Sequence, residues 1–219
     1  DIAWVRRELG ICLREVNPTE SVAMLKDALA ASSGGMGRGP NGLGADLYLE
    51  LAKSQLRAGA TQDALQNARK AEQSLQGASA LDMAKVGIYL HYFHISLGNL
   101  LLSLGDASGA LTHLQTALPL AQAALAEKPA NLALQRDLAD CYEGLGSYYV
   151  GSASAAQLTS AQQAEHWRQA RNWYQKSQRV WQTWTGAKSV FTQRRTALVA
   201  QALARCDQAL ATLTSARRG

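Results

Sequence analysis

Apolar residues recur along the chain at intervals of three and four, which is the period of an amphipathic helix. Between breaks at Pro, Gly and Ser, this pattern predicts nine helices. Their approximate ranges are 2–16, 18–32, 44–58, 61–76, 80–104, 106–127, 130–150, 160–184 and 189–215. Val and Ile are sparse beside Ala, Leu and Gln, which disfavours extended strands. The pattern therefore predicts an all-α protein.

Particular residues mark where several of these helices begin and end. Asn17-Pro18 supplies a capping side chain followed by Pro at the first helical position, where a missing N–H does no harm. Gly59 and Gly105 each follow a helix and suit the positive φ angle that commonly ends one. A Lys-Pro pair at 128–129 ends another helix, because the residue before Pro avoids the α conformation.

One arrangement of residues occurs twice, at 51–71 and at 97–117. Each copy has Leu followed by Ala or Gly, a Gly eight places after the Leu, and small or apolar residues at places thirteen, seventeen and twenty. The positions are Leu51, Ala52, Gly59, Ala64, Ala68 and Ala71 in one copy, and Leu97, Gly98, Gly105, Ala110, Leu114 and Ala117 in the other. Looser copies place Gly10 before Ser21, Leu25 and Ala28, and Gly146 before Ala170, Tyr174 and Ser177. We expect the small residues to let paired helices approach closely.

This arrangement resembles the tetratricopeptide repeat, over about residues 2–184. The resemblance implies one domain, 1–219, built as a superhelical stack of about four helix pairs with a capping helix over 189–215. The pairs would be about 2–32, 44–76, 80–127 and 130–184. The Leu-Gly places lie 42, 46 and 48 residues apart, longer than the roughly 34 of that repeat, and HEAT-like helix pairs share this longer spacing.

The resemblance also implies a concave groove lined by the first helix of each pair. The groove positions would be Trp4, Arg7, Ile11, Arg14, Glu15, Asp46, Leu49, Lys53, Leu56, Arg57, Tyr92, Ile95, Asn99, Leu102, Ser103, Asp140, Glu143, Ser147 and Val150. The predicted ligand site is the subset Trp4, Arg7, Arg14, Lys53, Arg57, Tyr92 and Asn99. Such a groove is basic and apolar at one end and suits a protein or peptide with an acidic end. Binding of chaperone tails is not predicted, because place six of the repeats does not keep that pattern.

A second resemblance concerns the stretches 170–184 and 197–210, which are similar to the helical region that follows the kinase domain in bacterial eukaryotic-like Ser/Thr kinases. The kinase motifs themselves are absent from this sequence. The resemblance implies an alternative function, a sensor or self-association region that binds a small ligand or a partner. It leaves the compartment open, cytoplasmic or extracytoplasmic if the kinase spans a membrane.

Charge is unevenly distributed within the net +5. Residues 160–219 hold ten Lys/Arg and two acids, a balance of +8, and the rest of the chain has a balance of −3. A second alternative is therefore a helical nucleic-acid binder, although no motif supports it and a solvated basic face explains the charge equally well. Its contacts would be Arg194, Arg195, Arg205, Arg217 and Arg218. No apolar run is long enough to predict a membrane span, and the start at Asp1 without Met fits a processed protein or a fragment.

Several patterns that carry chemistry elsewhere are given structural interpretations here. The range 37–42 spells Gly-x-Gly-x-x-Gly but follows a helix, and without a strand before it we interpret it as a linker between two helix pairs. His91 and His94 share a helix face but lack neighbouring ligands for a metal. Asp137, Asp140 and Glu143 are interpreted as an exposed acidic face, with a small acidic patch in the groove as the alternative.

The remaining candidates are thiols and aromatic rings. Cys12, Cys141 and Cys206 all fall on apolar stripes, which favours buried free thiols over catalytic or disulfide-bonded ones. Five large rings crowd one helix, and we expect them to pack on the last helix, with an exposed aromatic anchor for a partner as the alternative. They are Trp167, Trp173, Tyr174, Trp181 and Trp184. The sequence thus predicts no catalytic site, no metal and no cofactor.

Overall fold

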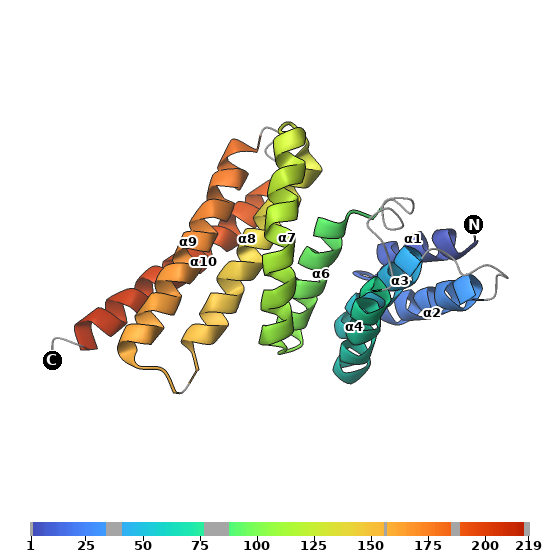
Figure 1. Cartoon of the computed structure of the whole chain (residues 1–219), viewed down its shortest axis with the longest axis horizontal. Helices are drawn as coiled ribbons and strands as arrows, with labels where there is room; N and C mark the ends of the chain where they lie inside the picture. The colour runs from blue at the N-terminus through green and yellow to red at the C-terminus, as the bar shows by residue number, and fades with distance from the viewer. Residues whose placement is uncertain (1, 34–40, 77–87, 156, 185–188, 217–219) are drawn as a thin grey trace. The chain divides into compact units, whose positions relative to one another are not determined.

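The computed structural model describes residues 2–33, 41–76, 88–155, 157–184 and 189–216 (Figure 1). Within these ranges the chain is helical and contains no strand, so the all-α prediction is confirmed there. The helices are α1 (Ile2–Leu13), α2 (Pro18–Ser33), α3 (Asn41–Arg57), α4 (Thr61–Gln76), α6 (Leu90–Ser103), α7 (Ala107–Glu127), α8 (Leu132–Ala153), α9 (Ser160–Thr183) and α10 (Val190–Ala216). The chain divides into two compact units, Asp1–Asp106 and Ala107–Gly219, and each is described by itself.

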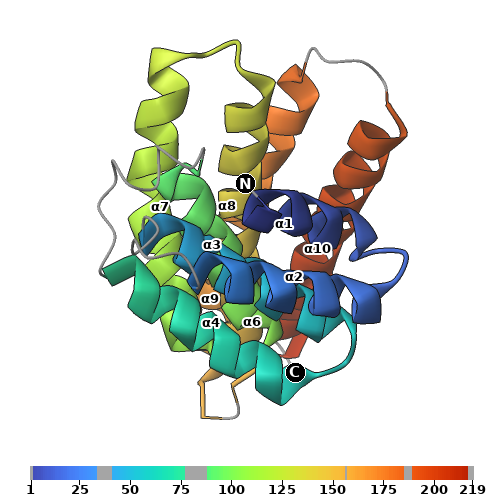
Figure 2. The ribbon, with the colours of Figure 1, turned by 90° about the vertical axis from the view of Figure 1, so that its right-hand side faces the viewer.

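In the first unit each helix packs against the next one along the chain, and α1 to α4 lie side by side (Figure 2). The helices α1, α3 and α6 also contact one another in that order. A core cluster forms where α2 meets α3, from Leu25, Ala28, Leu43, Leu47 and Leu51. The sequence-adjacent pairing of α1 with α2 and α3 with α4 agrees with the pairs predicted from the recurring residues.

The second unit follows the same order of packing, with α7 on α8, α8 on α9 and α9 on α10 (Figure 1). Its core cluster joins the last three of these helices through Ala139, Ala170, Tyr174, Trp181, Val199 and Cys206. Trp167 and Trp184 pack against this cluster while partly exposed. The expectation that the aromatic rings of α9 pack on the last helix is confirmed for these side chains.

The predicted turns and caps are present where the structure describes them. Gly59 and Gly105 have φ angles of 81° and 85°, which side chains other than Gly rarely adopt. In each turn a backbone N–H reaches back to the helix, from Ala60 to the Gln55 carbonyl at 2.8 Å and from Asp106 to the Leu101 carbonyl at 2.9 Å. Asn17 accepts a hydrogen bond from the Glu20 N–H at 3.2 Å through its side chain, as an N-cap does.

The recurring small residues mark close helix contacts. A Cβ atom on Gly10 would lie 2.7 Å from the Leu25 side chain, and one on Gly146 would lie 2.9 Å from the Tyr174 ring. The small or apolar second-helix positions of all four copies are buried: Ser21, Leu25, Ala28, Ala64, Ala68, Ala71, Ala110, Leu114, Ala117, Ala170, Tyr174 and Ser177. The close approach predicted for the helix pairs therefore occurs between α1 and α2 and between α8 and α9.

Helix boundaries differ from the prediction at a few ends. The helix predicted over 2–16 ends at Leu13, and that predicted over 44–58 begins at Asn41, so two residues of the 37–42 stretch belong to α3. The rest of that stretch lies outside the described residues. Within the helix predicted over 80–104, α6 begins at Leu90, and Tyr89 before it is extended, with φ −85° and ψ 134°. Residues 80–87 of that prediction lie outside the described residues. A single domain over 1–219 stays a prediction.

Candidate functional site

The candidate site lies in the first unit, on the side of α1 and α3 that carries the predicted groove residues. Arg7 of α1 forms an ion pair with Asp46 of α3 and another with Glu8. Its guanidinium also lies 4.9 Å from the centre of the Trp4 ring, which is 40% exposed. Two residues predicted from separate repeats, Arg7 and Asp46, thus meet directly between α1 and α3.

Glu50 of α3 is the centre of this charged site. Arg14, in the turn after α1, forms an ion pair with Glu50 and donates a hydrogen bond to the Ser54 hydroxyl at 3.0 Å. Lys53 donates to the same carboxylate at 2.8 Å and lies 5.4 Å from the centre of the Tyr92 ring on α6. We call Arg7, Arg14, Asp46, Glu50 and Lys53 the ion-pair network; it links α1 to α3 and reaches α6.

Burial and charge act in opposite directions on the carboxylates of the network. Burial by itself would raise the pKa of Glu50, but the charges of Lys53 and Arg14 outweigh it and lower that pKa to about 2. For Asp46 burial prevails, and its pKa is raised despite the bond from Arg7. One Asp46 oxygen, Oδ1, is buried and has no hydrogen-bond partner in the described part of the chain.

The cations predicted for the basic end of the groove are paired within the chain. Four predicted cations each face a carboxylate: Arg7 pairs with Asp46 and Glu8, Arg14 and Lys53 with Glu50, and Arg57 with Glu15. These cations are therefore neutralised within the chain, and three of them are largely buried. A sequence-based assignment of facing positions found the cations but could not show which carboxylates would meet them.

The part of the site that solvent reaches is smaller than predicted. Arg57 on α3 pairs with Glu15 at 2.6 Å, and their side chains are 56% and 70% exposed. Tyr92 and Asn99 are half-buried on α6, and Trp4 is exposed on α1. An incoming ligand can therefore contact one exposed ion pair and two aromatic rings, above a charged layer that is already satisfied except at Asp46.

The second unit has a related cluster, where the acidic residues of α8 meet the last helix. Arg195 of α10 forms an ion pair with Asp140 and donates to Glu143 at 2.8 Å. Glu143 also accepts from the Trp181 indole N–H at 2.9 Å and from the Ser177 hydroxyl at 2.8 Å. The predicted exposed acidic face is therefore wrong for Asp140 and Glu143, whose carboxylates face the protein.

Asp137, the third acid of that predicted face, is also not exposed. Only 5% of Asp137 is accessible, and its carboxylate accepts a hydrogen bond from Arg136 at 3.0 Å.

Burial raises the pKa of Asp140 to about 6, although the charge of Arg195 acts to lower it. The negative charges of Glu143 and Asp137 raise the pKa of Asp140 further, whereas the positive charge of Arg136 lowers it.

Two of the three cysteine thiols are buried and one is exposed. Cys141 and Cys206 are buried as predicted, and burial raises their pKa values to about 12 and about 11. Cys12 is exposed, contrary to the prediction, because the apolar stripe of α1 that it shares with Val5 and Leu9 faces solvent. In the described ranges, no group of three or more His, Cys, Asp and Glu side chains could hold a metal ion.

The predicted nucleic-acid contacts are only partly accessible. Arg195 is engaged by Asp140 and Glu143, whereas Arg194 and Arg205 are exposed on α10. Arg217 and Arg218 lie outside the described residues. No helix among those described has both the length and the apolar character needed to cross a membrane.

Comparisons with known proteins add no identification. Neither the models of known protein families nor the curated proteins give a match to this chain. The function is therefore argued from the residues and their geometry alone.

Proposed function

We propose that the chain is a non-enzymatic scaffold of tetratricopeptide-like helix pairs, closed by α10, that binds a protein or peptide segment. In the first unit the ligand would lie along the face formed by α1, α3 and α6. The observation that carries the proposal is the contact between groove positions of successive repeats. Arg7 meets Asp46, Arg57 meets Glu15, and Lys53 faces Tyr92. Successive first helices that share one side are what a peptide-binding groove requires.

The exposed groups on this face indicate how the ligand would be held. Trp4 and Tyr92 offer ring surface, and aromatic side chains contribute strongly at binding surfaces. Arg57 offers a guanidinium that pairs with Glu15, and because the Glu15 side chain is itself 70% exposed, another carboxylate can replace it. An acidic residue of the ligand can replace Glu15 on Arg57, which is the acidic end we propose for the partner. The buried ion-pair network below would fix the spacing of α1 and α3.

The proposal is tested by selecting peptides from a displayed library against the whole chain and measuring their affinities by fluorescence anisotropy. We expect Arg57→Glu to weaken the selected peptides about tenfold, because it repels the acidic end at the site of contact. Trp4→Ala should weaken them by a similar factor through lost ring contact. Arg14 and Lys53 are left unchanged, since their loss would strand a buried carboxylate.

The matched control is Arg69→Glu, which makes the same charge change at an exposed residue of α4, away from the proposed face. Its affinities should equal those of the unchanged chain. The proposal is wrong if no peptide is selected. It is also wrong if Arg69→Glu weakens binding as much as Arg57→Glu, because the effect would then come from net charge alone.

A further inference from the structure

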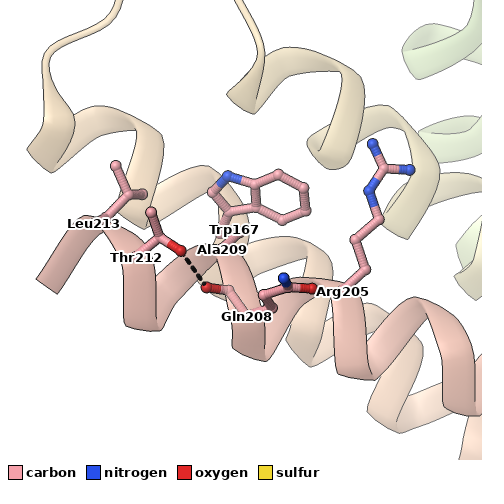
Figure 3. A pocket seen from close by; sticks show the side chains of 6 residues that line it. All are labelled: Trp167, Arg205, Gln208, Ala209, Thr212 and Leu213. Atoms are coloured by element: carbon pink, nitrogen blue, oxygen red, sulfur yellow. Dashed lines mark hydrogen bonds between the residues drawn. The ribbon is translucent and has the colours of Figure 1, made fainter. Parts of the chain in front are cut away.

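A pocket of about 370 Å³ lies between α9 and α10 in the second unit (Figure 3). Its lining consists of Trp167 from α9 and of Arg205, Gln208, Ala209, Thr212 and Leu213 from α10. The α10 residues are spaced three and four apart, so they share one face of that helix. The volume falls in the lower range of small-ligand sites, large enough for one ring and its substituent.

The two ends of the pocket differ in chemistry. Figure 3 shows the Trp167 ring standing over α10, with Arg205 towards one end and Leu213 towards the other. The guanidinium carbon of Arg205 lies 5.8 Å from the centre of the Trp167 ring. The ring, Ala209 and Leu213 form an apolar wall, and Arg205 places a positive charge beside it.

Arg205 differs from the arginines of this unit that pair with acids. Arg168, Arg171 and Arg195 each pair with a carboxylate. Arg205 is exposed and forms no salt bridge with any residue that the structure describes. Its donors are therefore available to an anion, and the stacked ring limits the positions that the guanidinium takes.

The polar groups beside Arg205 complete the site. The Thr212 hydroxyl donates to the backbone carbonyl of Gln208 at 3.0 Å, which leaves its oxygen free to accept. The Gln208 side-chain amide makes no hydrogen bond within the described part of the chain and can donate to the same anion as Arg205.

We propose that this pocket binds a carboxylate joined by a short link to an aromatic or other apolar group. The carboxylate would pair with Arg205 and Gln208, since a guanidinium and a carboxylate match in shape and charge. The apolar group would lie against Trp167 and Leu213. Two sources offer this chemistry, a free aryl carboxylic acid and the C-terminal residue of a peptide. The site shares no residue with the face of α1, α3 and α6. The ligand proposed for this pocket and the proposed function can therefore be tested independently.

The test uses the whole chain labelled with nitrogen-15 and follows the indole N–H signal of Trp167, assigned by its loss in Trp167→Phe. The probe is N-acetylphenylalanine, and its uncharged amide is the comparison compound. We expect a saturable shift with the acid, at a dissociation constant of about 0.1–1 mM, and at least tenfold weaker binding of the amide.

Two variants locate the charge that binds. Arg205→Gln should weaken the acid about tenfold or more, because it removes the guanidinium and keeps a polar side chain. The matched control is Arg194→Gln, an exposed arginine of the same helix about 16 Å away. It changes the net charge equally and should bind as the unchanged chain does. Circular dichroism confirms that both variants are folded.

The source of the carboxylate is distinguished by two further probes. Indole-3-acetate represents the free acids, and a hexapeptide ending in Phe with a free carboxylate represents peptide ends. Binding of either one at Trp167, lost in Arg205→Gln, supports the pocket and names its source. The proposal is overturned if no probe shifts the Trp167 signal at about 10 mM. Equal binding of acid and amide, or unchanged binding by Arg205→Gln, also overturns it.

Discussion

At the scale of single residues, two glycines set how closely helices pack. Gly10 and Gly146 occupy corresponding places in the repeated pattern, and each faces a large side chain of the next helix, Leu25 or Tyr174. A side chain at either place would overlap its neighbour. Gly151, later in α8, has no atom within 4 Å of where its Cβ would lie. In α8, Gly146 is therefore needed for close contact with Tyr174, whereas the position of Gly151 has room for a side chain.

We predict opposite effects of Ala at these two places in α8. Gly146→Ala should lower the free energy of unfolding by about 1–3 kcal/mol, because the Tyr174 ring must move from a position that would be 2.9 Å from the new methyl. Gly151→Ala should raise it by about 0.5–1 kcal/mol, since Ala favours the helix and meets nothing. Urea unfolding followed by circular dichroism measures both. Equal effects of the two changes would contradict the close contact.

At the scale of helices, ion pairs join α10 directly to α8. Arg195 contacts Asp140 and Glu143, which lie 55 and 52 positions earlier in the chain. Its guanidinium also lies 5.4 Å from the centre of the Trp181 ring. Partial burial of Asp140 disfavours its charged form in the folded chain and raises its pKa, although Arg195 acts to lower that pKa.

We predict a pH dependence of stability that comes from Asp140. Its folded pKa of about 6 lies above the ordinary value of 3.8 for an aspartate, so the folded chain holds this proton more tightly than the unfolded chain does. The contribution of Asp140 is therefore full below about pH 4 and is lost as pH rises through 6. The loss should be about 1–3 kcal/mol, reduced by the partial exposure of the carboxylate.

The measurement compares urea unfolding of the unchanged chain and of Asp140→Asn at intervals from pH 4 to pH 7. The unchanged chain should lose stability relative to the variant across this range, because Asn has no proton to release. Asp207→Asn, which removes an exposed carboxylate from α10, controls for the change in net charge. A difference that grows in favour of the unchanged chain would show that Arg195 outweighs burial.

At the scale of the whole molecule, part of the positive charge of the described chain is paired with its own carboxylates and is not available to a long polyanion. The cations of the ion-pair network face carboxylates in the first unit. In the basic segment of the second unit, Arg168, Arg171 and Arg195 pair with acids. Arg194 and Arg205 remain exposed on the described part of α10, whereas binding to duplex DNA needs several cations along one face.

We predict weak binding to nucleic acid. A random-sequence DNA duplex of about 20 base pairs should bind more weakly than about 10 µM at 150 mM salt. Between 50 and 200 mM salt, the logarithm of the binding constant should fall with a slope no steeper than about −4. Fluorescence anisotropy of labelled DNA measures both quantities. A submicromolar constant with a steeper slope would favour the nucleic-acid alternative over the peptide scaffold.

Much of the helical architecture followed from local patterns. The period of apolar residues, the cap at Asn17 and the glycines at 59 and 105 act over a few residues, so they could be recognised without knowing the fold. The small or apolar residues at the second-helix places of each copy are buried, as the predicted close approach of the helix pairs requires. Local patterns placed helix ends less well, as at Leu13 and at Leu90, where the preceding Tyr89 makes no side-chain capping hydrogen bond.

The candidate site depended on tertiary structure. The sequence by itself determined the helices and the small residues that let paired helices approach closely. Only the packed chain decided that Arg7 meets Asp46, 39 positions away, and that Glu50 holds both Arg14 and Lys53. The same holds for Arg205, which lies beside Trp167 in the second unit and forms no salt bridge with a described residue. Helical periodicity fixes the direction of a side chain, whereas the partner of a charge depends on which helices become neighbours.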